Sequence, residues 1–119
     1  MTPRSPHAAD TVEVAEAARL VADGGVILLD VREPGEWQAG RSPDAHHVPL
    51  GALGALDPGV LPAHQVVIVV CRSGIRSAKA TSILRAVGVP ARNLAGGMRA
   101  WAAAGLPVTT EDGQPGTVI

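Results

Sequence analysis

The clearest structural signal in this chain is the run Val66-Val67-Ile68-Val69-Val70, followed by Cys71-Arg72-Ser73-Gly74-Ile75-Arg76-Ser77. Five consecutive apolar, β-branched residues predict a strand that is buried on both faces, as the strands of a parallel sheet are. A helix is expected to follow over about residues 76–87, because Gly88 and Pro90 then end it. The unit is therefore a strand, a short polar loop and a helix, with the cysteine placed where the strand ends.

Strands and helices are expected to alternate on both sides of this unit. The pattern predicts helices over residues 11–23 and 98–104, a short helix fed by the loop 33–37, one helical turn over 50–56, and strands over 26–29, 46–49 and 92–94. Thr11 is the expected cap of the first helix, and the strand at 26–29 ends at Asp30. This alternation implies an α/β domain with a mainly parallel sheet and helices on both faces. In such sheets, ligands bind at the carboxyl ends of the strands, where Cys71 lies.

The length and composition are those of one domain. The chain has 119 residues, 46% of them hydrophobic, and no Phe or Tyr, so Val, Leu, Ile and Ala must fill its core. We expect a flexible lead over residues 1–10, one domain over 11–108 and a mobile C-terminal tail over 109–119.

The same composition disfavours several classes of protein. The net charge is −1 and Trp37 and Trp101 are the only aromatic residues, so we expect neither strong attraction to nucleic acid nor stacking of its bases. No apolar run approaches the roughly 18 residues of a membrane span, and residues 1–10 lack the apolar stretch of a secretory signal. We therefore expect a cytoplasmic protein that binds neither nucleic acid nor membranes.

Charge is unevenly distributed along the chain. Residues 1–57 hold nine acidic and four basic residues, whereas residues 58–110 hold six basic residues and no Asp or Glu. Two of those six, Arg72 and Arg76, flank the only cysteine, Cys71. A single cysteine excludes an intramolecular disulfide and cysteine-rich zinc or iron–sulfur sites in this chain.

The geometry expected around Cys71 favours a reactive thiolate. The first N–H groups of the following helix have no partners within the helix and carry partial positive charge, so they can hold an anion. A cysteine beside a helix start and beside arginines loses its proton more readily, and we expect the pKa of Cys71 to lie below about 8.5. The alternative is an inert cysteine, buried as a small hydrophobic residue. The small and polar residues Ser73, Gly74 and Ser77 argue against it.

Four motifs, in this order, resemble those of the rhodanese family. Residues 71–77 are similar to the active-site loop of that family. Residues 29–37, LDVREPGEW, are similar to its D-V-R-E-P-x-E-[FWY] segment, and residues 40–50 to its G-H-I-P-G-A-x-N-I-P-L segment. Residues 96–108 resemble its C-terminal G-G-x-x-A-W and A-G-L-P-V. The resemblance spans roughly residues 11–108, and it implies the three-layer α/β/α rhodanese-like fold around a sheet of about five short strands.

The resemblance also implies a chemistry. Cys71 is then the catalytic nucleophile, which takes a sulfane sulfur from thiosulfate or a persulfide donor and carries it, as a persulfide, to a cyanide or thiol acceptor. A thioredoxin-like protein is one such acceptor. The donor and the persulfide would be bound by the loop residues Arg72, Ser73, Gly74, Ile75, Arg76 and Ser77, and the two arginines would ease departure of the leaving anion. Neither a metal nor an organic cofactor is required, because sulfur itself is the transferred group.

The length of the loop bears on the choice between enzyme classes. The six residues from Cys71 through Arg76 match the sulfur-transfer branch of the superfamily, whereas the related phosphatases resemble C-x5-R, with one residue more. A cysteine phosphatase or an arsenate reductase is therefore a less favoured alternative. The other alternative is a non-catalytic rhodanese-like binding or regulatory module, although such domains often lack the cysteine that is retained here.

The sequence leaves more than one role possible for two pairs of residues outside the loop. Asp30 and Arg32 either take part in catalysis or form an ion pair that braces the loop beside the pocket, and we favour the brace. Trp37 and Trp101 are expected to pack within the domain, although Trp37 could line the wall of a pocket.

The segment after residue 40 departs from the family pattern. Arg41, Ser42 and Asp44 stand where His, Ile and Gly are usual, and His47 stands where Asn is common. We expect these changes to affect the rim of the pocket and the choice of donor rather than the chemistry of the cysteine. Neighbouring His46 and His47 point to opposite faces if they are extended, which disfavours a metal site there.

Overall fold

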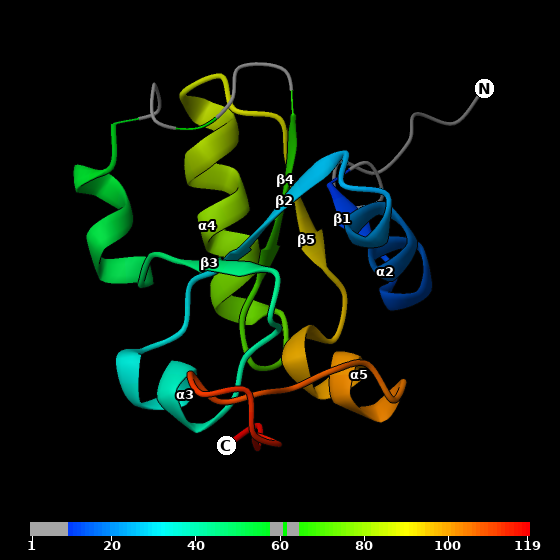
Figure 1. The fold of residues 1–119 in the computed structure, drawn as a ribbon. Coiled ribbons are helices and arrows are strands. Elements are labelled where there is room, and N and C mark those ends of the chain that lie inside the picture. The colour runs from blue at the N-terminus through cyan, green and yellow to red at the C-terminus, as the bar shows by residue number, and fades with distance from the viewer. Residues whose placement is uncertain (1–9, 58–60, 62–64) are drawn as a thin grey trace.

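The computed structural model describes residues 10–57, 61 and 65–119 (Figure 1). Its strands are β1 (Thr11–Val12), β2 (Val26–Asp30), β3 (Ala45–His47), β4 (Val66–Val70) and β5 (Ala91–Leu94). Its helices are α2 (Val14–Ala22), α3 (Pro34–Ala39), α4 (Ile75–Ala86) and α5 (Gly97–Ala103), with the 3-10 helix η1 (Leu50–Ala55). The strand predicted at residues 66–70 and the helix that follows it are both present, so the unit around Cys71 folds as the sequence indicates.

The strands form one sheet in the order β1-β5-β4-β2-β3, and every neighbouring pair is parallel. β2 and β4 are paired over their full length, from Val26 with Val66 to Asp30 with Val70. Since the strands are parallel, their carboxyl ends lie at one edge of the sheet. Figure 1 shows α3, α5 and the C-terminal segment gathered at this edge, so the loop after β4 opens towards them.

Alternate residues of β4 enter two separate cores, one on each face of the sheet. Val67 and Val69 lie in a core with buried residues of α4 and η1, whereas Ile68 and Val70 lie in a core with buried residues of α2 and α5. A strand that is apolar on both faces is required between two helical layers. The arrangement confirms the predicted three-layer α/β/α fold with a parallel sheet.

The N-terminal edge of the sheet differs from the prediction. Thr11 does not cap a helix: it pairs with Asn93 and the next residue, Val12, pairs with Leu94, which makes β1 an added edge strand. The helix begins at Val14 and has no side-chain cap. A strand of two residues is too short to show an alternating pattern, and a threonine before an apolar helical run fits a cap equally well locally.

The segment predicted to be a mobile tail is hydrogen-bonded to the domain. The backbone N–H groups of Thr109 and Arg41 donate to each other's carbonyl oxygens over 2.8 and 2.9 Å, and the Thr117 N–H donates to the Ala39 carbonyl over 2.8 Å. A Cβ built on Gly116 would lie 2.7 Å from the Cα of Gly40, so the two backbones touch where these glycines meet. The segment 109–119 therefore lies against the end of α3.

Two predictions concern the chain ends and membranes. The lead predicted over residues 1–10 lies, apart from Asp10, outside the described residues. In the part of the chain that the structure describes, no helix is both long enough and apolar enough to cross a bilayer.

Candidate active site

Cys71 directly follows β4, and its sulfur receives two hydrogen bonds. The Gly74 N–H donates to Sγ over 3.1 Å and the Ser77 hydroxyl lies 3.2 Å from it. The residue is only 1% exposed and packs against the core on the α4 side of the sheet. Cys71 is thus buried, but its sulfur faces polar groups at the start of α4 rather than apolar side chains alone.

The loop takes this shape because Gly74 allows a turn that most residues resist. Gly74 precedes the first residue of α4 with φ of 109°, a conformation that side chains other than glycine rarely adopt. Its carbonyl oxygen accepts a hydrogen bond from the Asn93 amide nitrogen over 3.0 Å. Asn93 lies in β5, the neighbour of β4, so the sheet itself fixes the turn of the loop.

The start of α5 supports the loop from the other side. The Met98 N–H donates to the Cys71 carbonyl over 2.7 Å, and the Arg99 N–H donates to the Arg72 carbonyl over 3.0 Å. A Cβ built on Gly97, whose φ is 58°, would meet the Cys71 carbonyl oxygen at 2.4 Å. Glycine at position 97 is therefore what lets α5 approach the loop this closely.

Ser77 links the sulfur to Asn93. Its hydroxyl oxygen lies 3.2 Å from Cys71 Sγ and 2.5 Å from Asn93 Oδ1, but a hydroxyl has one proton to donate. When Cys71 is a thiol, its S–H can donate to Ser77 while Ser77 donates to Asn93. When Cys71 is a thiolate, the Ser77 proton can turn to the sulfur, so the arrangement accommodates both protonation states.

The pKa of Cys71 lies below its usual value. Burial acts to raise it, but hydrogen bonds from the Ser77 hydroxyl and from the backbone amides of Ser77, Gly74 and Ser73 favour the thiolate and outweigh the burial. The direction agrees with the expectation from the sequence. The cause is the set of hydrogen bonds at the start of α4.

The two arginines of the loop have different surroundings. Arg72 is exposed. Arg76 places its two terminal nitrogens 2.6 and 2.8 Å from the two carboxylate oxygens of Glu36 in α3. A two-pronged pair of this kind is the strongest geometry between a guanidinium and a carboxylate. The expected role of Arg76 in binding the donor stays a prediction.

Glu36 is well placed to remain charged. The hydrogen bond from Arg76 is the largest influence on the pKa of Glu36 and lowers it, against a smaller opposing effect of burial. Glu36 also belongs to the capping box of α3, where its side chain accepts the Glu33 N–H over 3.2 Å. No local pattern gave Glu36 a role, although residues 58–110 hold no Asp or Glu, so a carboxylate partner for Arg76 had to come from elsewhere in the chain.

Asp30 and Arg32 form a fully buried ion pair behind the loop. Arg32 Nη2 lies 2.7 Å from Asp30 Oδ2, and both side chains are 0% exposed. The same nitrogen donates to the Gly40 carbonyl over 2.7 Å, and Nη1 donates to the Glu36 carbonyl over 3.3 Å. This geometry is that of a brace between the end of β2 and the two ends of α3, the reading that the sequence analysis favoured.

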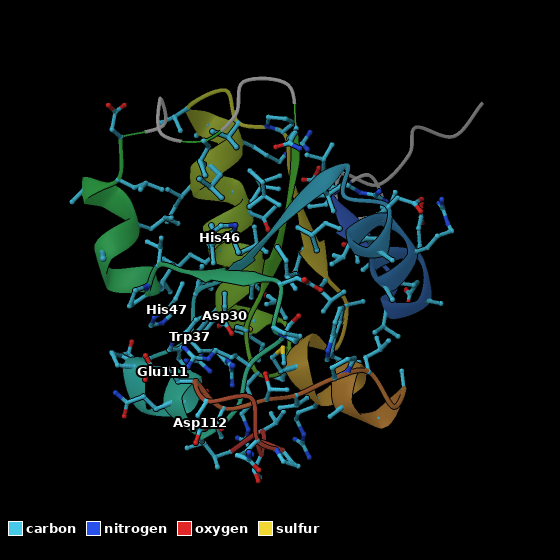
Figure 2. The ribbon with its side chains drawn as sticks, in the orientation of Figure 1. Asp30, Trp37, His46, His47, Glu111 and Asp112 are labelled. Carbon is cyan, nitrogen blue, oxygen red and sulfur yellow. The ribbon has the colours of Figure 1, made fainter. Side chains whose placement is uncertain are left out.

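Trp37 lies near Asp30 of this pair (Figure 2). Its ring stacks on His47 with centroids 4.6 Å apart, and the Arg41 guanidinium lies 4.5 Å from the ring centroid. An open cavity of about 760 Å³ is lined by Trp37 and Arg41 together with Glu111 and Asp112 of the C-terminal segment. Two of the residues that depart from the family pattern, Arg41 and His47, are thus the two that flank Trp37.

The structure also shows where the remaining residues singled out from the sequence lie. Ser73 and Ile75 are exposed, and Ile75 is 80% exposed, the largest value among the large hydrophobic residues described. Trp101 is buried in the core on the α5 side and donates to the Pro107 carbonyl over 2.9 Å. Among the described residues, no group of three His, Cys, Asp or Glu side chains is arranged to hold a metal ion.

Besides Glu36, sequence reasoning missed Asn93 and Gly97 as site residues. Asn93 carried a signal, because Asn is disfavoured in strands and stands here near the carboxyl end of β5. Gly97 was read only as the opening of a helix. Its close approach to the Cys71 carbonyl depends on where α5 packs, which no local pattern reveals.

Comparison with known proteins gives one consistent family. The family model of the rhodanese-like domain matches residues 13–104. A protein of Allochromatium vinosum named sulfurtransferase is 36% identical over 96 residues, which are 80% of this chain and 89% of that one. The human single-domain sulfurtransferase TSTD1 superposes with a TM-score of 0.73 at 30% identity, covering 80% of this chain and 96% of that one. A Mycobacterium tuberculosis protein named HTH-type transcriptional regulator Rv0324 is 34% identical over 108 residues, but they make up 46% of its length.

Proposed function

Because the chain belongs to the rhodanese-like domain family, we propose that it is a sulfurtransferase that moves a sulfane sulfur through a persulfide on Cys71. The donor is a small anion, thiosulfate or a persulfide, and the acceptor is cyanide or a thiol, including that of a thioredoxin-like protein. One observation carries the proposal: the sulfur of Cys71 receives hydrogen bonds from the Gly74 N–H and the Ser77 hydroxyl at the start of α4. Such donors stabilise negative charge on sulfur.

In the first step the Cys71 thiolate attacks the outer sulfur of the donor. With thiosulfate, a bond forms between Cys71 Sγ and the sulfane sulfur while the sulfur–sulfur bond of thiosulfate breaks, and sulfite leaves with the electron pair. The negative charge then rests on the outer sulfur of the persulfide. We expect the loop amides that favour the thiolate to stabilise this anion as well.

In the second step the acceptor attacks the outer sulfur. The bond between the two sulfur atoms of the persulfide breaks, and its electron pair returns to Sγ, which restores the Cys71 thiolate. Cyanide leaves as thiocyanate, and a thiol acceptor leaves as its persulfide. No electrons are gained or lost over the cycle, so the proposed reaction needs no redox cofactor.

The burial of Cys71 is compatible with transfer to an acceptor. The residue is 1% exposed, but a persulfide extends it by a sulfur–sulfur bond of about 2.05 Å. The acceptor therefore meets the outer sulfur and has no need to reach Sγ itself.

An assay with thiosulfate and cyanide tests the proposal. The protein should form thiocyanate, and Cys71→Ser should abolish the activity because an alkoxide is not available at neutral pH to take its place. Ser82→Ala serves as the control, since Ser82 is exposed on α4 and donates only to the Ala78 carbonyl. Thiocyanate formation that survives in Cys71→Ser would end the proposal.

The second candidate is a binding or regulatory module without catalysis. It is favoured by the relative named as a transcriptional regulator, in which the matched region is less than half of the protein. A module of this kind would take up no sulfur from thiosulfate or from persulfide donors. A reducible sulfur adduct on Cys71 would therefore argue for the enzyme.

A cysteine phosphatase or an arsenate reductase is the remaining alternative. The loop from Cys71 to Arg76 is one residue shorter than the phosphatase pattern, and Arg76 is already paired with Glu36. Robust hydrolysis of an aryl phosphate that depends on Cys71 would favour this alternative over sulfur transfer.

A further inference from the structure

Arg76, the last residue of the loop, is already occupied by a carboxylate. Its two terminal nitrogens donate to both carboxylate oxygens of Glu36, over 2.6 and 2.8 Å. The Arg76 side chain is 33% exposed and that of Glu36 is 17% exposed, so the pair is partly shielded from water. When a carboxylate accepts hydrogen bonds from both terminal nitrogens of a guanidinium, those N–H groups are not free to bind a second anion. The carboxylate also neutralises part of the positive charge that a second anion would meet.

Glu36 is held in this position by the residues that directly precede α3. Its Oε1 accepts the Glu33 N–H over 3.2 Å, and its backbone carbonyl accepts Arg32 Nη1 over 3.3 Å. Arg32 is in turn fixed by the fully buried carboxylate of Asp30 at the end of β2. The pair between Glu36 and Arg76 is therefore built into the contact between α3 and α4, which distinguishes it from an ordinary surface ion pair.

Arg72 is the other guanidinium of the loop. Its side chain is exposed, and none of the ion pairs found among the described residues involves it. We propose that Glu36 sets the charge preference of the site: by occupying Arg76 it leaves Arg72 as the unpaired guanidinium of the loop, which disfavours doubly charged sulfur donors relative to singly charged ones. This inference rests on the proposed sulfur transfer. It names singly charged sulfane donors, such as persulfides and thiosulfonates, as the preferred substrate class.

The first test measures anion selectivity at Cys71 without requiring sulfur transfer. Iodoacetate, an anion, and iodoacetamide, which is neutral, both alkylate the Cys71 thiolate, forming a carbon–sulfur bond as iodide leaves. The ratio of their rate constants at one pH and one ionic strength reports the charge near the thiolate, because the thiolate fraction cancels. Glu36→Gln, which frees Arg76, should raise the ratio of iodoacetate to iodoacetamide about five-fold, the effect of one further unit charge at roughly 4 Å in water.

Matched variants separate pairing from simple loss of negative charge. Glu33→Gln also removes one carboxylate from the start of α3, but that carboxylate makes no hydrogen bond to Arg76 and attracts it only through space, so the ratio should rise much less than in Glu36→Gln. In an Arg76→Gln background, Glu36→Gln should raise the ratio less than it does with Arg76 present, because no guanidinium is then released. If Glu36→Gln does not fold, as judged by circular dichroism, Glu36→Asp should raise the ratio in the same direction, because its shorter side chain cannot fill the fork equally well.

The second test compares two sulfur donors that differ by one charge. Thiosulfate is doubly charged and methanethiosulfonate is singly charged, and they release sulfite and methanesulfinate respectively when Cys71 takes the sulfane sulfur. In Glu36→Gln, the KM for thiosulfate should fall about five-fold relative to that for methanethiosulfonate, with the ratio of the two kcat values unchanged.

Two results would overturn the inference. One is an unchanged alkylation ratio in folded Glu36→Gln, and the other is an equal rise in Glu33→Gln. Absence of sulfur transfer from both donors in the wild type would contradict the proposed function instead, and the alkylation ratio would still decide whether Glu36 controls the charge that anions meet at Cys71.

Discussion

The sulfur of Cys71 is subject to two opposing effects. Burial raises the pKa of a thiol, whereas hydrogen bonds from the Ser77 hydroxyl and the loop amides lower it, and the hydrogen bonds prevail. An inert cysteine in an apolar core would experience the first effect alone. The polar side of the sulfur is what distinguishes Cys71 from the apolar residues with which it packs.

Removing the Ser77 hydroxyl should therefore raise the pKa of Cys71. Ser77→Ala deletes the donor that contributes most to the stabilisation of the thiolate, while burial remains. The rate of alkylation by iodoacetamide, followed against pH, should show a midpoint below about 8.5 in the wild type and a higher one in the variant. Ser82→Ala, on the exposed side of the same helix, should leave the midpoint unchanged. A wild-type midpoint at or above the free-thiol value would contradict the account of the site.

The sequence predicted the position of Cys71 but not all of its neighbours. The apolar run before it and the glycine after it are local signals, so the strand, the turn and the direction of the pKa shift followed from them. The pairing of Arg76 with Glu36 joins residues 40 positions apart, and the contact of Asn93 with Ser77 joins β5 to α4. Contacts of this kind depend on how elements pack, which a local pattern does not specify.

Elements that are long and apolar were the easiest to predict. β2 and β4 appear where continuous apolar runs predicted them, because a central strand of a parallel sheet has no exposed face. β1 was missed because it has two residues and is defined only by its pairing with β5. α5 was predicted within one residue, but its contact with the loop was not.

That contact gives a prediction for Gly97. In Gly97→Ala the new Cβ would lie 2.4 Å from the Cys71 carbonyl oxygen, in a backbone conformation that alanine resists. Denaturation in urea should show a loss of about 2 kcal/mol or more in the free energy of unfolding. Gly105→Ala is the matched control, because Gly105 has a similar positive φ but no atom within 4 Å of its Cβ. Gly105→Ala should lose only about 1 kcal/mol in the free energy of unfolding, because only its backbone conformation is unfavourable for alanine. Equal losses in the two variants would show that the approach of α5 to the loop is not tight.

Across the whole molecule, the side chains on the two faces of the single sheet pack into two separate cores. The division follows directly from the alternation of residues along β4, so the sequence was sufficient to predict a three-layer fold. It was not sufficient for the segment after residue 108, which has no periodic pattern and was expected to be mobile. Its hydrogen bonds to Arg41 and Ala39 depend on two glycines, Gly40 and Gly116, that come together only in the folded chain.

The meeting of these glycines can be tested by adding one methyl group. In Gly116→Ala, the Cβ would lie 2.7 Å from the Cα of Gly40 and 3.0 Å from the Ala39 carbonyl oxygen, so the segment 109–119 must shift. We expect faster limited proteolysis near the C-terminus and a loss of about 1–3 kcal/mol in the free energy of unfolding. Gly51→Ala, where no atom lies within 4 Å of the new Cβ, should change neither. Wild-type resistance to protease in Gly116→Ala would mean that the segment does not depend on this contact.

The loop after β4 is expected to stabilise negatively charged sulfur on Cys71. Intact-mass spectrometry after treatment with a sulfur donor tests this claim. With thiosulfate, and with a persulfide donor in parallel, the wild-type chain should gain the mass of one sulfur atom, and a reductant should remove it. Cys71→Ala should gain nothing under the same conditions. A wild-type chain that takes up no sulfur from either donor, or a Cys71→Ala chain that takes up as much as the wild type, would contradict the claim.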